Sequence, residues 1–178
     1  MDDTAECVVL VDADDRETGT MPKLAAHREG ARHRAVSVFL RDGRGRVLMQ
    51  RRAFTKYHSP GLWANACCSH PRPGDAPIVT AARRLREELG LEAALRDVGR
   101  VAYRAQLGNG MIEDEIVHLF IGQTDRIPVP RPDEVSEWHW TEPEALAAAL
   151  ESEPHRFAAW FRIYAERIPA TALRALPP

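Results

Sequence analysis

The segment from residue 75 to residue 89 constrains the fold most, because it predicts a helix with a single apolar face. Its apolar stripe consists of residues at helical spacing: Ile78, Ala82, Leu85 and Leu89. Asp75 is expected to cap the first turn, and Gly90 suits the position after the last one. This segment is the clearest helix signal in the chain.

Strands are predicted on both sides of this helix. Alternating apolar residues around a turn at residues 42–45 predict a hairpin over residues 35–50. The other predicted strands cover residues 7–11, 98–106, 115–123 and 136–140. Residues 57–74 are rich in Pro, Gly, Trp and Cys and predict a long loop, and such loops in compact domains are often functional.

Two further helices are predicted in the last part of the chain. Residues 141–144, Thr-Glu-Pro-Glu, resemble a capping box with proline just inside a helix that runs to about Glu151. A second helix is expected over residues 157–168. Few helices among many strands predict an α+β fold, an α/β/α layered arrangement with a mixed central sheet flanked by helices.

Length, charge and cysteine content narrow the class of protein. The 178 residues are expected to form one domain, residues 1–178, and a net charge of −2 gives no reason to expect nucleic acid as a partner. No apolar run reaches the ~20 residues of a membrane span, and the acidic start is unlike a signal peptide. The three cysteines suit reduced thiols better than a disulfide framework. We expect a cytoplasmic monomer or weak homodimer.

Three consecutive carboxylates lie at residues 113–115. On a strand, Glu113 and Glu115 point to one face and Asp114 points to the other. A cation between the two glutamates would remove their mutual repulsion. A solvated strand edge is the alternative, and these residues taken alone favour it.

Three histidines lie near segment ends or in loops, where ligands can converge: His27, His33 and His70. Together with the two glutamates they would form a mixed nitrogen and oxygen site suited to Mn, Zn, Fe or Co. Taken singly, each fits an incidental surface histidine better.

The predicted helix carries two pairs of opposite charge at i,i+4 spacing, Arg83 with Glu87 and Arg84 with Glu88. The second pair lies beside the apolar stripe. Glu88 is therefore the carboxylate better placed to face a site, for instance as a ligand of Mg²⁺ on a diphosphate. Two ordinary surface pairs are the alternative.

Several cations precede the long loop: Lys23, Arg51, Arg52 and Lys56. Arginine binds phosphate oxygens as a planar fork and lysine binds them as a point charge. Arg51 and Arg52 face opposite ways on a strand, so at most one of them easily joins a given site. Taken singly, each cation fits a solvated charge.

Cys67 and Cys68 are adjacent, which disfavours a disulfide between them. Near a metal-bound histidine and a cationic pocket, a cysteine is expected to have a lowered pKa and to act as an acid, a base or a nucleophile. A small buried hydrophobic residue is the alternative.

Together these segments resemble the type 1 isopentenyl-diphosphate isomerases of the Nudix superfamily. The most specific parts are residues 63–71, which read Trp-Ala-Asn-Ala-Cys-Cys-Ser-His-Pro, and residues 113–115. Residues 51–56 and 103–105 support the resemblance. The Arg-Glu pair of a Nudix box is Arg83-Arg84 here, which argues against ordinary pyrophosphate hydrolysis and matches the isomerase branch.

The resemblance implies a role for individual residues. Cys68 would be catalytic together with Glu115 and Tyr103, whereas Cys67 would not. The implied ligands of a Mn²⁺ or Zn²⁺ ion are His27, His33, His70, Glu113 and Glu115. Glu88 and the main-chain carbonyl of Cys68 would hold Mg²⁺ on the diphosphate. The implied substrate contacts are Lys23, Arg52, Lys56, Arg84 and Trp160, with Trp63 as a second aromatic candidate.

The reaction implied by the resemblance converts isopentenyl diphosphate to dimethylallyl diphosphate in isoprenoid biosynthesis. An alkene carbon would be protonated and a tertiary carbocation then deprotonated, with Cys68 and Glu115 on opposite faces of the substrate. Two alternatives remain. A Nudix hydrolase of another diphosphate would need the missing glutamate and would have no use for Cys68, and a non-catalytic binding protein would bind metal or diphosphate without turnover.

Overall fold

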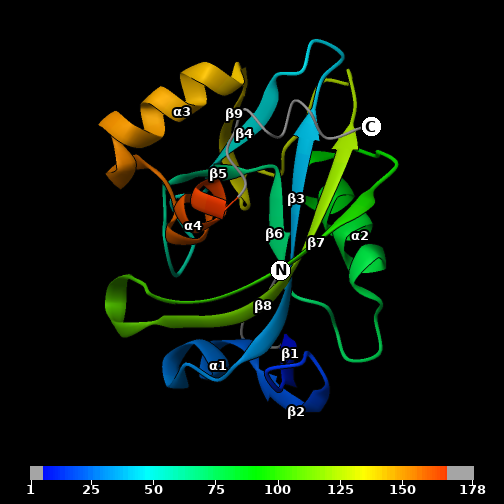
Figure 1. The fold of residues 1–178 in the computed structure, drawn as a ribbon, viewed down its shortest axis with the longest axis vertical. Helices are drawn as coiled ribbons and strands as arrows, with labels where there is room; N and C mark the ends of the chain where they lie inside the picture. The colour runs from blue at the N-terminus through cyan, green and yellow to red at the C-terminus, as the bar shows by residue number, and fades with distance from the viewer. Residues whose placement is uncertain (1–5, 168–178) are drawn as a thin grey trace.

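One mixed sheet forms the centre of the computed structural model, which describes residues 6–167 (Figure 1). Its nine described strands are β1 (Cys7–Val11), β2 (Glu17–Pro22), β3 (His33–Arg41), β4 (Val47–Arg52), β5 (Trp63–Asn65), β6 (Cys67–Ser69), β7 (Arg96–Gln106), β8 (Ile112–Gln123) and β9 (Val135–Thr141). The described α-helices are α1 (Lys23–Glu29), α2 (Pro77–Leu89), α3 (Pro143–Ser152) and α4 (Ala159–Arg167). The predicted α+β class, with helices flanking a mixed sheet, is confirmed.

Strand β3 lies at the middle of this sheet and is buried along its whole length. It pairs antiparallel with β1, β4 and β6 and parallel with β8. The register places His33 opposite Glu115, and it places Ser37 opposite Cys68. Residues far apart in the sequence therefore meet along the first half of β3.

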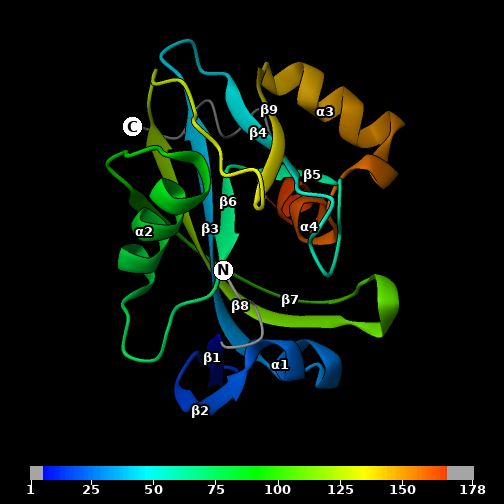
Figure 2. The ribbon, with the colours of Figure 1, turned by 180° about the vertical axis from the view of Figure 1, so that it is seen from behind.

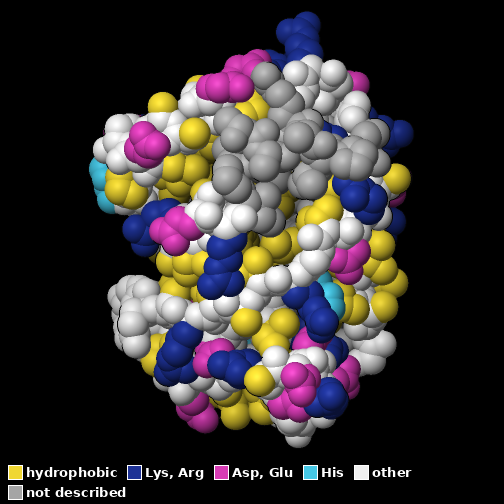
Figure 3. Space-filling view, viewed as in Figure 1, with side chains coloured by type: hydrophobic (Ala, Val, Ile, Leu, Met, Phe, Trp, Pro, Cys, Tyr) yellow, Lys and Arg dark blue, Asp and Glu magenta, His cyan; other side chains and the backbone are white. Residues whose placement is uncertain are grey.

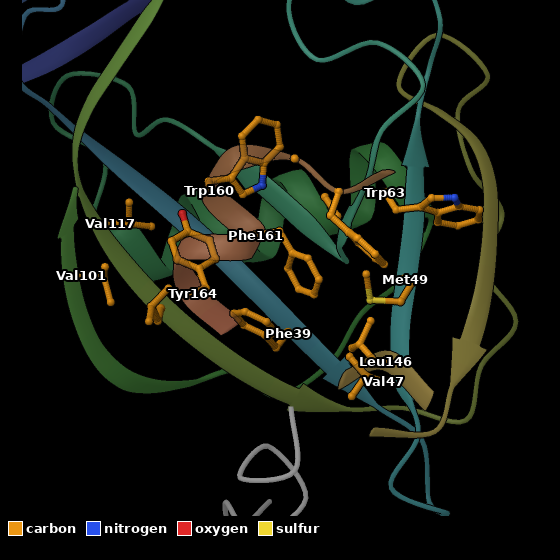
Figure 4. Packing of buried hydrophobic residues seen from close by; sticks show 14 of the residues in the cluster. Phe39, Val47, Met49, Trp63, Val101, Val117, Leu146, Trp160, Phe161 and Tyr164 are labelled. Atoms are coloured by element: carbon orange, nitrogen blue, oxygen red, sulfur yellow. The ribbon is translucent and has the colours of Figure 1, made fainter. Parts of the chain in front are cut away.

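Helices cover the two faces of the sheet, α2 on one face and α3 with α4 on the other (Figures 1 and 2). The alternation of a strand divides the core in the same way. Val36, Val38 and Leu40 pack with α2, whereas Ala35 and Phe39 pack with α4. Figure 4 shows the α4 side, where Phe39 lies with Phe161 and Tyr164 between the helix and the sheet.

The buried face of α2 differs from the predicted stripe. Ile78 is 43% exposed and Ala82 is exposed, whereas Ala81, Leu85 and Leu89 are fully buried. The physical reason is that Arg84 and Glu88 are buried beside the core as an ion pair, which rotates the helix toward its charged row. The prediction is therefore wrong for the first two residues of the stripe, Ile78 and Ala82, and confirmed for Leu85 and Leu89.

Two predicted helix caps are also wrong. The N-cap of α2 is Ala76 rather than Asp75, and the N-cap of α3 is Glu142 without a side-chain cap bond, so no capping box forms at Thr141. In both helices a proline at the first position fixes the start without a side-chain acceptor. Helix α4 begins at Ala159 because Phe157 pairs with Trp63, and the predicted end at Ile168 lies outside the described residues.

The predicted hairpin over residues 35–50 exists, but its strands share a single register pair, Arg41 with Val47. Beyond it β3 pairs with β6, while β4 pairs with β5 and β9. The predicted loop at residues 57–74 therefore contains two short strands, and β2 and α1 are further elements that the sequence did not predict. Within residues 6–167, no helix is long and apolar enough to cross a membrane.

Candidate active site

A pocket is lined by side chains from the sheet, from α2 and from α4, and most of the predicted site residues line it. The predicted residues that line it are Lys23, Arg52, Lys56, Cys68, His70, Arg84, Glu88, Tyr103, Glu113, Glu115 and Trp160. His27 and His33 lie behind this lining with fully buried side chains. Trp63, the second aromatic candidate, is not part of the lining and packs on the ring of His139.

Four of the predicted metal ligands converge at one side of the pocket. One ligand atom from each of His27, His33, His70 and Glu115 lies within 4.8 Å of the others. The three imidazole rings are 5.0–5.4 Å apart between centroids. His70 Nε2 and His33 Nε2 lie 3.1 and 3.4 Å from the same oxygen, Glu115 Oε1.

The second nitrogens of two rings are engaged with the main chain. His27 Nδ1 lies 2.8 Å from the Lys23 carbonyl oxygen, and His33 Nδ1 lies 2.8 Å from that of Ala31. This arrangement leaves Nε2 of each ring toward the cluster, as in protein metal sites. His27 Nε2 is buried and has no hydrogen-bond partner among the described residues. Imidazoles fixed in this way beside a buried carboxylate fit a divalent metal ion.

The carboxylates of β8 alternate as predicted. Glu113 and Glu115 are 3% and 5% exposed and face the pocket, which rules out a solvated edge. Asp114 points to the other face, where Arg32 Nε lies 2.7 Å and Arg104 Nη1 2.9 Å from its oxygens.

Tyr103 joins the two glutamates, since its hydroxyl oxygen lies 2.8 Å from Glu113 Oε2 and 2.8 Å from Glu115 Oε2. Burial and the neighbouring Glu115 charge raise the pKa of Glu113 well above its usual range. Burial opposes ionisation of Glu115 too, but hydrogen bonds from His33 and His70 outweigh it and hold its pKa well below the usual range. The Tyr103 hydroxyl carries a single proton, so it donates to one of the two glutamates at a time.

Cys67 and Cys68 lie on opposite faces of β6. Cys68 faces the pocket, where its thiol donates to Asn65 Oδ1 at 3.3 Å and lies 3.3 Å from Ser37 Oγ. Cys67 faces α2, and its thiol donates to Glu88 Oε1 at 3.4 Å. The sequence predicted a lowered pKa for this thiol. The structure contradicts that prediction, because burial raises the pKa of Cys68 to about 12.

Positive charge gathers at the other side of the pocket. Lys56 Nζ lies 2.6 Å from Glu134 Oε2, and Arg84 Nη2 lies 2.8 Å from Glu88 Oε1 and 3.2 Å from Glu134 Oε1. Burial opposes the charge of Arg84, but Glu88 and Glu134 raise its pKa. The buried Arg84–Glu88 pair differs from the surface pair Arg83–Glu87, whose atoms lie 3.2 Å apart.

Arg51 and Arg52 point to opposite sides, as predicted. The guanidinium of Arg52 lies 5.0 Å from the centre of the Trp160 ring in the pocket. Arg51 instead binds Glu137 at 2.8 Å outside it. Lys23, the first residue of α1, lines the pocket and pairs with Glu6 at 3.2 Å.

Several residues of this region were missed by sequence reasoning: Ser37, His58, Asn65, Glu134 and Tyr164. Asn65 is fixed beside the Cys68 thiol, because its amide donates to Ser37 Oγ and to the Val38 carbonyl, both at 2.8 Å. Asn65 stands inside the segment 63–71, so that motif carried a signal for it. Glu134 carried none, because its partners come from other segments.

The chain is similar to known proteins over most of its length. A family model described as the NUDIX domain matches residues 31–161. An isopentenyl-diphosphate Delta-isomerase 1 of Aromatoleum aromaticum is 46% identical over 161 residues, 90% of this chain and 91% of that protein. The isopentenyl-diphosphate Delta-isomerase of Cereibacter sphaeroides is 50% identical over 145 residues, covering 80% of this chain and 81% of its own.

Solved structures share the fold. The protein DR0079 of Deinococcus radiodurans superposes with a TM-score of 0.76 at 20% identity, covering 91% of this chain and 98% of its own. A MutT protein of Methanosarcina mazei Go1 gives a TM-score of 0.63 at 22% identity, covering 76% and 91%. At these identities the superpositions support the fold alone.

Proposed function

The chain belongs to the isopentenyl-diphosphate Delta-isomerase family of Nudix domain proteins, and on that premise we propose a role for each side chain of the pocket. The enzyme converts isopentenyl diphosphate to dimethylallyl diphosphate. The terminal alkene carbon gains a proton, and the carbon next to the diphosphate-bearing one loses a proton. The double bond moves while the composition of the molecule stays the same.

The proposal rests chiefly on one observation, that Cys68 and Glu115 reach the same pocket from two different strands. Strands β6 and β8 both pair with β3, and both side chains line the pocket with Tyr103. We assign proton transfer on one face of the substrate to Cys68 and on the other face to Glu115. Tyr103 polarises Glu115 through the 2.8 Å contact between its hydroxyl and Glu115 Oε2.

We assign the diphosphate to the cationic side of the pocket. Lys23, Arg52, Lys56 and Arg84 all line it, and their charge suits an anionic group. The Trp160 ring is 3% exposed and lies beside Arg52. In our proposal its face stabilises the tertiary carbocation by about 1–2 kcal/mol, and the closed pocket keeps water from quenching it.

Two divalent ions complete the proposal. The residues that would hold a Mn²⁺ or Zn²⁺ ion are His27, His33, His70, Glu113 and Glu115, and Glu88 would hold Mg²⁺ with the carbonyl of Cys68. When bound, these ions supply positive charge that keeps Glu115 ionised and neutralises diphosphate oxygens. We expect chelation to inactivate the enzyme, and Mn²⁺ or Zn²⁺ together with Mg²⁺ to restore it.

One experiment separates this proposal from its alternatives. The enzyme is incubated with isopentenyl diphosphate, Mg²⁺ and Mn²⁺ in D₂O, and the products are followed by NMR. Deuterium in dimethylallyl diphosphate supports proton transfer from an exchangeable group. Released phosphate would instead support a Nudix hydrolase, and recovery of unlabelled substrate would support binding alone. The cytoplasmic location, the monomeric or weakly dimeric state and the extent of the domain stay predictions.

A further inference from the structure

The Cys68 thiol is held by two polar side chains that are not part of the pocket lining. Ser37 on β3 and Asn65 on β5 are both fully buried. Ser37 stands directly opposite Cys68 in the pairing of β3 with β6, and its Oγ lies 3.3 Å from Cys68 Sγ. Asn65 Oδ1 lies 3.3 Å from the same sulfur. The proton transfer proposed above gives neither side chain a role.

The orientation of the Asn65 amide follows from its partners. Its nitrogen lies 2.8 Å from the main-chain carbonyl oxygen of Val38 and 2.8 Å from Ser37 Oγ. A carbonyl oxygen only accepts hydrogen bonds, so the NH₂ group has to lie on that side. Oδ1 is then left beside Cys68, where it accepts the thiol hydrogen. The amide is therefore fixed as a donor to Ser37 and an acceptor for Cys68.

This orientation decides what the Ser37 hydroxyl donates to. Its oxygen accepts a hydrogen from Asn65, so its own hydrogen needs another acceptor. Within residues 6–167, the sulfur of Cys68 is the other hydrogen-bonding partner of this hydroxyl. The three hydrogen bonds therefore run in a ring: Asn65 donates to Ser37, Ser37 donates to Cys68, and Cys68 donates to Asn65.

Proton transfer changes the charge on the sulfur inside this ring. If the thiol gives its proton to the alkene, the π electrons form the new C–H bond and the S–H electron pair stays on sulfur as a thiolate. If the thiolate instead removes a proton from the carbocation, that pair takes up the proton and the C–H pair becomes the new double bond. Ser37 can donate to thiol and thiolate alike, whereas Asn65 Oδ1 accepts only from the thiol. Because hydrogen bonds to charged groups are the stronger ones, the Ser37 bond gains strength as the thiolate forms.

We propose that Ser37 is a positioning residue for Cys68. Asn65 turns the Ser37 hydrogen toward the sulfur, and that hydrogen both aims the thiol and stabilises negative charge on it. This inference rests on the proton transfer that we assign to Cys68, and it adds a residue that lies outside the pocket lining. Stabilisation that grows during the reaction appears in kcat rather than in substrate binding.

The variant Ser37→Ala removes only the hydroxyl group. With Mg²⁺ and Mn²⁺ present, we expect kcat to fall about tenfold or more and KM for isopentenyl diphosphate to stay within about twofold. The S–H stretching band in the Raman spectrum gives a readout that does not depend on turnover. Subtracting the spectrum of the matching Cys68→Ala protein isolates the Cys68 band. This band should shift toward that of a free thiol in Ser37→Ala, because hydrogen bonds in a ring reinforce one another.

Thr80→Val is the matched control. It removes a fully buried hydroxyl from α2, where Thr80 contacts Asp75 outside the pocket, and it should leave kcat and the Cys68 band unchanged. Circular dichroism checks folding. If Ser37→Ala does not fold, Ser37→Cys replaces it in the kinetics, since it keeps a similar volume but is a weaker donor.

A Cys68 band that stays in place, or an unchanged kcat, would overturn the inference. An equal fall in kcat for Thr80→Val would also overturn it, because the loss would then be general to buried hydroxyls. Ordinary turnover by Cys68→Ala would instead overturn the proton transfer assigned to Cys68. The failure of the inference and the failure of the proposed function are therefore distinguishable.

Discussion

The two adjacent cysteines illustrate how a one-residue step changes chemistry. Because strand side chains alternate, Cys68 enters the pocket and Cys67 enters the core beneath α2. The two thiols have different partners, Asn65 and Ser37 for Cys68 and Glu88 for Cys67. Any role in proton transfer to the substrate therefore belongs to one thiol only.

Replacing Cys68 with Ala should lower kcat by at least about 10²-fold, because a positioned acid or base contributes about 10²–10⁴. Replacing Cys67 with Ala is the matched control and should retain most of the activity. Steady-state kinetics on isopentenyl diphosphate measure both. Equal losses from the two substitutions would contradict the assignment.

The alternating carboxylates of β8 allow a second matched pair. Glu115→Gln keeps the shape of the side chain but removes a charge and a base, so kcat should fall by about 10²-fold or more. Asp114→Asn lies on the opposite face, where it weakens the pairs with Arg32 and Arg104, and should change kcat little. Kinetics on both variants, with metal content measured in each, check the prediction. Ordinary turnover by Glu115→Gln would remove that residue from the chemistry.

At the scale of elements, helix α2 links the core to the pocket through two adjacent rows. Ala81, Leu85 and Leu89 fill the space under β3 and β6, while Arg84 and Glu88 reach the cationic side of the pocket. The helix thus places its charged groups by burying a neighbouring apolar row. Packing in that row is what keeps Glu88 in position.

Two substitutions distinguish the buried face of α2 from the predicted one. Leu85→Ala should lower the free energy of unfolding by about 2–5 kcal/mol, because Leu85 is fully buried and a cavity remains. Ile78→Ala should cost about 0.5 kcal/mol or less, since Ile78 is 43% exposed. Urea unfolding measures both, and similar losses would contradict the observed rotation of the helix.

Local patterns were sufficient for part of the fold and of the site. The alternation of Glu113 and Glu115 was predictable because it follows from strand geometry alone. The three-residue strands β5 and β6 were not, because they depend on distant partners in β3 and β4. The buried face of α2 was missed for the same kind of reason, since Glu134 stabilises Arg84 across 50 residues. His58 looked like a loop residue until the fold placed it against His27.

At the scale of the whole molecule, charged networks join segments that are far apart in the sequence. Asp15, in the turn between β1 and β2, accepts hydrogen bonds from Arg34 on β3 and Arg100 on β7 and contacts His118 on β8 at 2.8 Å. Lys and Arg side chains are interspersed with Asp and Glu over the part of the surface near α1, β1 and β2 (Figure 3). Nearly equal numbers of the two signs, 24 Lys and Arg against 26 Asp and Glu, allow such pairs and give the small net charge of −2.

The Asp15 network predicts a pH dependence of stability. Burial raises the pKa of Asp15, but hydrogen bonds from Arg34, His118 and Arg100 outweigh it, so the folded-state pKa lies below 3.8. The stabilisation is therefore complete above the unfolded pKa and is lost as the pH falls through the folded one. Asp15→Asn tolerates the same positive φ of 67° and should destabilise the protein at pH 6 but much less at pH 3.

Urea unfolding of wild type and variant at the two pH values measures this difference. Asp14→Asn is the control, because Asp14 is exposed and pairs with Arg16 outside the network. A deficit of the same size at both pH values would show that Asp15 does not stabilise the fold through its charge.

The order in which the pocket is completed follows from the positions of its residues along the chain. The histidines at residues 27, 33 and 70 and the glutamates of β8 precede residue 116, whereas Glu134 and Trp160 come later. During synthesis on the ribosome, the side of the pocket that suits a metal ion therefore emerges before the side that suits a diphosphate is finished. A nascent chain can gather the proposed metal ligands while it still lacks Trp160, the proposed aromatic contact of the substrate.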